Sequence, residues 1–338
     1  MSVRFGLIGT GAIARMHARA HKSIGHVVRA CTDLNPDVGK AFASEFDAEY
    51  LPSWEDLCRH PEIDIVDVCA FPDVRLGPVE LSAKHGKHVQ VEKPIATSVD
   101  VAKRMIKIAR EAGITLGVVS QHRFDDASLF VQKAIQTDRL GRLIQCDAYV
   151  KWHRSDAYYS RPIKGSWATE GGGALINQAI HQVDLLRWLV GPVRDVAGMW
   201  QIGATHKIES EDVVCALLRY ENGATGVIQA STSIIPGYPE RLELHGTKGT
   251  AVISGDKLVT WDVPLDVGEP APIASQLASG ASDPMAISLT PFERQFRDFV
   301  EATRDGRPPL VSGEAGCEAL DIVERIYNAC RRDAGAHK

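Results

Sequence analysis

Among the side chains of this 338-residue chain that can bind or transfer protons, Lys93 and His181 each stand in a distinctive local sequence. Lys93 follows a short apolar run in the stretch Val-Glu-Lys-Pro, and Pro94 biases it away from helical backbone. His181 follows the glycine run Gly171–Gly173 and comes four residues after Asn177. A histidine can accept the proton of a hydroxyl, and a lysine can stabilise the negative charge that develops on the oxygen. The alternatives are a surface lysine and a histidine that is solvated or satisfied within the protein.

The segment from 174 to 190 predicts one helix that carries the polar pair on a face of its own. Residues four apart share a helix face, so Asn177 and His181 lie on one stripe with Ala174 and Asp184. The apolar stripe contains Ile176, Ile180, Val183, Leu186 and Val190. The polar pair therefore points away from the core stripe. We expect the glycines before this helix to let the backbone pass close to a ligand or a sheet.

The first residues of the chain predict a loop that binds phosphate. A short apolar strand breaks at Gly9-Thr10-Gly11 and resumes as a helix, in the pattern G-x-G-x-x-A that ends at Ala14. Gly9 permits a tight turn, Gly11 lets the backbone approach a pyrophosphate, and Ala14 lets the helix pack close to the strand. A phosphate placed there meets backbone N–H groups and the positive end of the helix dipole.

An acidic residue stands where a dinucleotide fold needs one. A second strand-like run ends in Asp33, about 20 residues after Gly11, which is the usual separation. A carboxylate at this place accepts hydrogen bonds from a ribose diol and repels a 2′-phosphate. No arginine or lysine directly follows Asp33, so the sequence favours NAD over NADP. The alternative is that Asp33 only begins a turn.

Strands and helices alternate through residues 1–122, which predicts a doubly wound, mainly parallel sheet. Strand-like runs occur at 63–70, 88–92 and 114–124, and 99–113 is an amphipathic helix. Ligands bind beyond the carboxyl ends of such strands. The residues expected to contact the cofactor are Gly9, Thr10, Gly11, Ala12, Ile13, Asp33, Ala70, Phe71, Pro72, Glu92 and Lys93.

The second part of the chain, residues 123–289, predicts an α+β domain that binds substrate and forms oligomers. Consecutive strand-like runs without helices between them lie at 143–153, 193–204, 211–234 and 241–262, one of them with an Asn-Gly turn typical of a hairpin. They predict a large, mainly antiparallel open sheet. Because an uncovered sheet face often pairs with a copy of itself, we expect a homodimer or homotetramer. The helices at about 290–334 are expected to pack back on the first domain.

The composition excludes several classes of partner. A hydrophobic share of 44% and a charged share of 24% are ordinary for a soluble globular protein, and a net charge of −5 gives no electrostatic case for nucleic acid or an anionic membrane. The seven cysteines are scattered and form no C-x-x-C pair, so we expect neither a metal site nor a disulfide framework. With no apolar stretch long enough to cross a bilayer, a cytoplasmic location is expected.

Taken together, the motifs resemble the glucose–fructose oxidoreductase, inositol dehydrogenase and rhizopine-catabolism (Gfo/Idh/MocA) family over nearly the whole chain. The resemblance rests on GLIGTGAIARMHARA, GKHVQVEKPIA, LGRLIQCDAY, GGGALINQAIHQVDLLRWLVG, ELHGTKGTAVI and the closing DFVEATRDGRPPLVSGEAGCEALDIVERIY. It implies an N-terminal Rossmann domain, a C-terminal domain with a large open sheet, a nicotinamide cofactor and a polyhydroxylated substrate. The usual reaction of the family interconverts a secondary alcohol and a ketone.

The resemblance also assigns roles to individual residues. Lys93 corresponds to the catalytic lysine of the family's Glu-Lys-Pro motif, and His181 to the histidine of the second-domain helix. Asn177 stands where the inositol-dehydrogenase-like branch has an aspartate. The stretch CAFPDVR, which ends at Arg75, departs from the usual Thr-Pro followed by a histidine, so the wall beside the nicotinamide is expected to be unusual.

These inferences predict an NAD-dependent oxidoreductase that acts on a sugar or cyclitol. His181 is the expected general base, Lys93 stabilises the developing charge, and the neutral Asn177 orients the substrate. Further expected substrate contacts are Arg123, Tyr158, Tyr159, Lys164 and Trp167.

Two other functions stay open. One is a 3-oxidase of a nucleotide sugar of the UDP-sugar acid type, in which Arg161 and Lys164 meet the diphosphate. The other is a cofactor-binding regulator without catalysis, against which the presence of both Lys93 and His181 argues.

Overall fold

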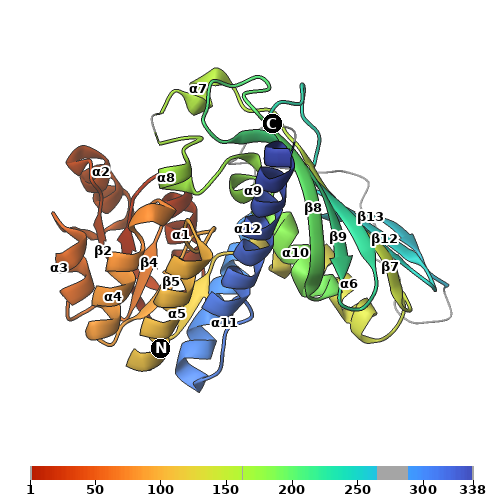
Figure 1. Cartoon of the computed structure of the whole chain (residues 1–338). Coiled ribbons are helices and arrows are strands. Elements are labelled where there is room, and N and C mark those ends of the chain that lie inside the picture. The colour runs from red at the N-terminus through yellow and green to blue at the C-terminus, as the bar shows by residue number, and fades with distance from the viewer. Residues whose placement is uncertain (1, 162, 265–287, 337–338) are drawn as a thin grey trace. The chain divides into compact units, whose positions relative to one another are not determined.

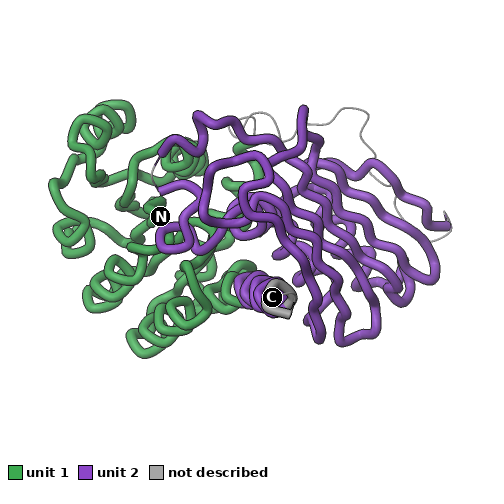
Figure 2. The backbone as a smooth tube through the Cα atoms, turned by 45° about the horizontal axis from the view of Figure 1, so that its top comes forward, with its two compact units in different colours: residues 1–121, 288–317 green, residues 122–287, 318–338 purple. Residues whose placement is uncertain are grey.

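The computed structural model describes residues 2–161, 163–264 and 288–336, and the chain forms two compact units. One unit comprises residues 1–121 and 288–317, and the other comprises residues 122–287 and 318–338 (Figure 2). The first break therefore falls one residue before the expected domain boundary. Of the two C-terminal helices, α11 (Thr290–Asp305) belongs to the first unit, whereas most of α12 (Gly313–Ala336) belongs to the second.

The first unit is built on a six-stranded parallel sheet in the order β3-β2-β1-β4-β5-β6. Figure 1 labels β2, β4 and β5 of this sheet. The strands of the sheet are β1 (Arg4–Ile8), β2 (Val27–Thr32), β3 (Glu49–Tyr50), β4 (Ile65–Val68), β5 (His88–Val91) and β6 (Leu116–Val118). This order confirms the doubly wound sheet. The chain reverses direction across the sheet between β1 and β4, which is where such folds bind their ligand.

Helices cover this sheet so well that all four residues of β4 are buried. They are α1 (Ala12–Ser23), α2 (Pro36–Phe46), α3 (Trp54–Arg59), α4 (Leu76–Lys84) and α5 (Val99–Ala112), with α11 beside α1. The predicted amphipathic helix at 99–113 is confirmed. The Ser98 hydroxyl accepts a hydrogen bond from the Val101 N–H at its start, and Gly113 ends it in a left-handed conformation.

The second unit contains a seven-stranded sheet in the order β13-β12-β11-β7-β10-β9-β8, antiparallel except for the β7–β10 pair. The strands are β7 (Leu143–Lys151), β8 (Val193–Ile202), β9 (Glu211–Tyr220), β10 (Thr225–Ser231), β11 (Arg241–Gly246), β12 (Thr250–Ser254) and β13 (Lys257–Asp262). The helices α6 (Asp126–Gln136), α9 (Ala174–Asn177) and α10 (Ile180–Val190) pack on one face. On the other face Met199 and Leu217 are more than half exposed, so the expected open sheet is confirmed.

The predicted continuous helix from 174 to 190 is interrupted, which corrects the expectation. Helix α9 ends at Asn177 and α10 begins at Ile180. The N–H groups of Gln178 and Ala179 both donate to the carbonyl of Ala174, at 3.1 Å each. The second of these bonds spans five residues, so the turn is one residue wider than in a regular α-helix. The apolar pattern continues across this wide turn, which is why the sequence alone gave no sign of it.

The glycine run before α9 lets the backbone lie directly against β9 and α12. A Cβ added at Gly173 would fall 1.9 Å from the carbonyl oxygen of Glu211, and one at Gly172 would fall 2.3 Å from the hydroxyl of Tyr327. Gly172 also has a φ of +150°, which L side chains rarely adopt. The Glu211 carboxylate accepts hydrogen bonds from the N–H groups of Gly173 (2.8 Å) and Leu175 (2.9 Å) and from the Tyr327 hydroxyl (2.8 Å). Of the two expectations for the run, close approach to a sheet is confirmed.

The close approach predicts that Gly173→Ala strongly destabilises the second unit. The added methyl group meets backbone rather than a movable side chain, so we expect a loss of at least about 3 kcal/mol of unfolding free energy. Gly223→Ala is the matched control, because Gly223 has a φ of +89° but open space around it, and it should cost about 1 kcal/mol. Urea unfolding of both variants measures the difference. Equal losses would show that contact with Glu211 is not what position 173 requires.

Candidate functional site

The glycine loop of the first unit has the geometry of a phosphate-binding turn. Gly9 follows β1 with a φ of +84°, and a Cβ there would lie 3.0 Å from the backbone nitrogen of Ala70. Gly11 precedes α1 with an ordinary φ of −67°, and a Cβ there would meet nothing within 4 Å. The fold therefore requires glycine at position 9 for its own sake. The open space beside Gly11 lies at the start of α1, where Ala12 and Ile13 begin the helix, and the pyrophosphate contact at this place stays a prediction.

Asp33 connects the end of β2 to this loop. One carboxylate oxygen accepts hydrogen bonds from the Thr10 N–H (2.7 Å) and the Thr10 hydroxyl (2.8 Å). The other accepts from the Asn35 N–H (2.9 Å), so Asp33 also begins the turn into α2. Asp33 can therefore begin a turn and still stand where a dinucleotide fold has its ribose-binding acid. Its carboxylate stands beside the glycine loop, and its role against a second phosphate on the ribose stays a prediction.

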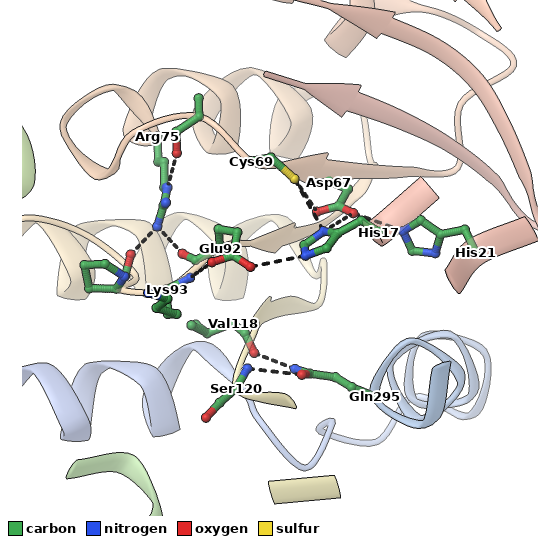
Figure 3. A network of polar contacts seen from close by, with 12 residues as sticks. His17, His21, Asp67, Cys69, Arg75, Glu92, Lys93, Val118, Ser120 and Gln295 are labelled. Atoms are coloured by element: carbon green, nitrogen blue, oxygen red, sulfur yellow. Dashed lines mark hydrogen bonds and ion pairs between the residues drawn. The ribbon is translucent and has the colours of Figure 1, made fainter. Parts of the chain in front are cut away.

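The Lys93 segment is held from two directions where β5 ends. The Glu92 carboxylate accepts a hydrogen bond from the Lys93 backbone N–H at 3.0 Å, and the Lys93–Pro94 peptide bond is cis. From the other side, the Arg75 guanidinium donates to the carbonyl oxygens of Glu92 and Pro94, and its Nε donates to the Ala70 carbonyl at 2.8 Å (Figure 3). The backbone on both sides of Lys93 is therefore clamped.

Arg75 is a site residue whose role the sequence did not reveal, although its departure from the family pattern was visible. Arg75 is only 3% exposed. Burial lowers its pKa to about 10, which still leaves the guanidinium charged at neutral pH. Its partners Ala70 and Pro94 come from the ends of β4 and β5. Phe71 is 39% exposed, Pro72 begins a short 3₁₀ turn, and the Ala70 backbone lies against Gly9, whereas contact of these residues with the cofactor stays a prediction.

In the second unit, burial singles out the polar pair. Every residue from Gly172 to Leu186 is buried except Asn177 and His181. The Asn177 side-chain amide donates to the carbonyl of Gly172 at 3.3 Å. Asn177 and His181 are thus partly exposed, whereas Ala174 and Asp184, the other two members of the predicted polar stripe, are buried. This is the arrangement expected of groups that meet a ligand.

His181 has a histidine neighbour that sequence reasoning missed. The ring of His122 lies 5.0 Å from the ring of His181, centroid to centroid, at an interplanar angle of 83°. Nδ1 of His122 lies 2.7 Å from the Asp125 carboxylate. Burial lowers the pKa of His122, but the charge and hydrogen bond of Asp125 outweigh burial and the pKa is raised. His122 directly precedes Arg123 in the sequence, and that adjacency was the available signal.

Arg123 is occupied by a buried ion pair. Its guanidinium donates to both oxygens of Asp184 at 2.7 and 2.6 Å, and both side chains are 4% exposed. The guanidinium also lies over the ring of Trp188 at 5.5 Å. This pair connects the segment after β6 to α10 and so helps to place His181. A substrate contact for Arg123 stays a prediction.

The remaining predicted substrate residues divide into two groups. The Tyr158 hydroxyl accepts a hydrogen bond from the Gln178 side chain at 3.1 Å, and the Lys164 amine lies 5.0 Å from the Tyr158 ring centroid while it pairs with Glu170. Tyr158 and Lys164 are thus brought beside the turn that follows Asn177. The other group consists of Tyr159, which donates to the Thr232 hydroxyl at 2.9 Å, and Trp167, whose ring packs against Trp200 and Tyr327.

Two family models match the chain. Residues 3–120 match the oxidoreductase family with an NAD-binding Rossmann fold, and residues 129–252 match the GFO/IDH/MocA C-terminal domain. The chain belongs to the Gfo/Idh/MocA oxidoreductase family. Its first unit is accordingly an NAD-binding Rossmann domain, which confirms the expected cofactor, and the protein is an oxidoreductase. In the described part of the chain, no helix has the length and apolar composition needed to cross a membrane.

Several relatives of this family match over almost the full chain. The WlbA dehydrogenase from Bordetella pertussis, solved with NADH and UDP-GlcNAcA, is 30% identical with a TM-score of 0.86 and covers 98% of this chain and 97% of its own. Inositol 2-dehydrogenase from Rhizobium meliloti is 25% identical, with 96% of each chain covered. Myo-inositol 2-dehydrogenase from Thermotoga maritima is 27% identical, with 94% of this chain and 93% of its own covered.

The two glycines of the loop predict separable defects. Gly11→Ala should leave thermal stability unchanged, because its methyl group meets open space, but weaken NADH binding by about tenfold or more, because it occupies the pyrophosphate site. Gly9→Ala should lower the thermal midpoint, because of its positive φ and its contact with Ala70. NADH fluorescence titration and thermal unfolding separate the two effects. Unchanged NADH affinity in Gly11→Ala would contradict this placement of the pyrophosphate.

Proposed function

We propose that this protein is an NAD-dependent dehydrogenase that interconverts a secondary alcohol and a ketone on a sugar or cyclitol. The observation that carries the proposal is the selective exposure of Asn177 and His181 within an otherwise buried stretch of fifteen residues, 172–186. The clamped backbone of Lys93 at the ligand edge of the Rossmann domain supports it. Relatives of nearly the same length that are inositol 2-dehydrogenases support the class of substrate.

The reaction assigns one task to each of three residues. His181 accepts the hydroxyl proton of the substrate as general base. The Lys93 ammonium hydrogen-bonds the same oxygen and stabilises the negative charge that develops as the carbon–hydrogen bond breaks. NAD, when bound, supplies the acceptor for the hydride. Asn177 is neutral and cannot take the proton, so it orients the substrate through its amide.

A nucleotide-sugar 3-oxidase is the second candidate, and a specific observation favours it. The Bordetella WlbA dehydrogenase, solved with UDP-GlcNAcA, is 30% identical over almost the whole chain. Lys164, next to Tyr158, and the exposed Arg161 are the basic groups that we propose for a diphosphate or a sugar carboxylate. The charge of Lys164 is already paired with Glu170, which is why we place this function second.

The assembly and the location of the protein also belong to this proposal. The open sheet face, with Met199 and Leu217 exposed, suits a homodimer or homotetramer formed between copies of the chain. The structure describes all seven cysteines and shows no disulfide bond among them, as suits the reducing cytoplasm.

Turnover and cofactor binding should separate in variants of the two catalytic residues. Lys93→Met and His181→Ala should each lower turnover by about 100-fold or more while NADH affinity stays within about threefold. Lys84→Met and His85→Ala, both exposed on the first unit, are matched controls that should keep activity. The assay follows reduced cofactor with cyclitols, sugars and UDP-sugar acids. Near-normal turnover in both variants would refute the site, and activity with UDP-sugar acids alone would favour the second candidate.

The position of Asp33 predicts a preference for NAD. We expect kcat/KM with NAD to exceed that with NADP by about tenfold or more, since the carboxylate repels a 2′-phosphate. Asp33→Ser should narrow this ratio, because it removes the charge but keeps an oxygen for Thr10. Initial rates with both cofactors measure the ratio. A clear preference of the unaltered protein for NADP would contradict the role of Asp33.

A further inference from the structure

A cluster of buried charged and polar groups lies within the Rossmann domain at the ends of β4 and β5. His17 and His21 project from α1 toward the carboxylate of Asp67 on β4, and Glu92 follows β5 (Figure 3). His17, His21 and Asp67 have no exposed surface, and Glu92 is 6% exposed. Buried charges are costly unless they are paired, so this cluster needs an explanation.

His17 joins two carboxylates. Its Nδ1 lies 2.9 Å from Asp67 Oδ2, and its Nε2 lies 3.2 Å from Glu92 Oε1. Only the doubly protonated ring can donate from both nitrogens, because a neutral imidazole has a single N–H. The geometry therefore makes His17 an imidazolium cation held between two anions.

The electrostatics of the cluster agree with this geometry. Burial lowers the pKa of His17, but Cys69 and Asp67 outweigh it, and the pKa is raised well above its usual value. Burial raises the pKa of the Cys69 thiol to about 12, so the thiol is neutral at physiological pH and the stabilising charge comes from Asp67. Although burial raises the pKa of Asp67, the charge and hydrogen bond of His17 lower it overall.

Glu92 carries this connection to the Lys93 backbone. One oxygen of its carboxylate faces His17, and the other accepts the hydrogen bond of the Lys93 N–H. A continuous series of contacts thus runs from α1, the helix that begins at the phosphate loop, through His17 and Glu92 to Lys93. With both oxygens used in this way, the Glu92 carboxylate is directed into the protein, and a contact of Glu92 with the cofactor stays a prediction.

We propose that His17 is a positioning residue that sets the place of the Lys93 amine by fixing the Glu92 carboxylate. This inference rests on the proposed catalytic role of Lys93. Without the imidazolium, Glu92 loses the group that orients its carboxylate, and the Lys93 N–H loses a fixed acceptor. Arg75 donates to the backbone carbonyls of Glu92 and Pro94 rather than to the Glu92 carboxylate, so it does not replace His17.

His21 offers a control within the same cluster. It lies one turn after His17 on α1, is equally buried, and its Nε2 lies 3.0 Å from the same oxygen of Asp67. Its ring is stacked between Phe5 and Phe296, at 3.7 and 4.2 Å. Burial lowers the pKa of His21 to about 4, so it is neutral. His21 therefore shares the structural surroundings of His17 but not its link to Glu92.

The test compares His17→Gln with His21→Gln in the full-length protein. Lysines are reductively methylated with ¹³C-formaldehyde, and the Lys93 signal is assigned by its loss in Lys93→Arg. We expect the Lys93 resonance to move or broaden in His17→Gln and to keep its position in His21→Gln. For an alcohol that the unaltered enzyme oxidises, kcat should fall by about tenfold or more in His17→Gln, with KM for NAD within about threefold, and stay near normal in His21→Gln.

His17→Gln removes the cation between two buried carboxylates and can therefore fail to fold. Glu92→Gln is the second variant, which tests the proposal in that case. This variant retains the His17–Asp67 pair, but an NH₂ group replaces one of the two oxygens that face His17 and the Lys93 N–H, so one of these two contacts loses its acceptor. It should also move the Lys93 resonance and lower kcat.

An unchanged Lys93 resonance and kcat in Glu92→Gln, or equal behaviour of His17→Gln and His21→Gln, would overturn the positioning role. Full turnover in Lys93→Met would instead refute the proposed function, while the comparison of Lys93 resonances would still decide whether His17 fixes the segment.

Discussion

The burial of the Asp67 carboxylate is the constraint on which the ligand edge of the Rossmann domain depends. A carboxylate without solvent contact at the end of a central strand needs a compensating partner, and the partner here is the imidazolium of His17. Because His17 belongs to α1, the pair also fixes the helix whose first residues face the phosphate loop. Because His17 reaches Glu92 as well, the same balance extends to the backbone of Lys93.

The second unit also contains a buried carboxylate, that of Glu211, but stabilises it with hydrogen bonds from neutral groups. The Glu211 carboxylate is buried and forms no ion pair with any residue that the structure describes, and hydrogen bonds from Gly173, Leu175 and Tyr327 offset part of the effect of burial, which raises its pKa to about 7. These bonds hold the start of α9 so closely that position 173 has no room for a side chain. Neither unit relies on solvent-exposed ion pairs, which contribute little to stability, to place its candidate catalytic residue. In each unit a buried carboxylate, that of Glu92 or of Glu211, accepts backbone hydrogen bonds beside the candidate functional side chain.

Those features that depend on local sequence could be predicted. Gly9, Gly11 and Asp33 follow from a short motif and one spacing, and the alternation of strands and helices gave the sheet types. Contacts between residues far apart in the sequence could not be predicted. Glu92 lies 75 residues from His17, and Tyr327 lies 151 residues from its contact with Ile176, so no local pattern records either pair. The wide turn between α9 and α10 was missed for a different reason, because the apolar periodicity continues through it.

Position 177 shows why a motif alone does not describe the site. An asparagine there cannot share a proton with His181 as an aspartate could, so the family pattern by itself suggests a histidine without acidic support. In the structure a carboxylate is connected to His181 through His122. Asp125 pairs with His122, and the ring of His122 meets that of His181 edge to face. The electrostatic surroundings of His181 therefore differ from a simple exchange of aspartate for asparagine. The surroundings of His181 thus include His122 and, through it, Asp125, as well as the residue one turn before it.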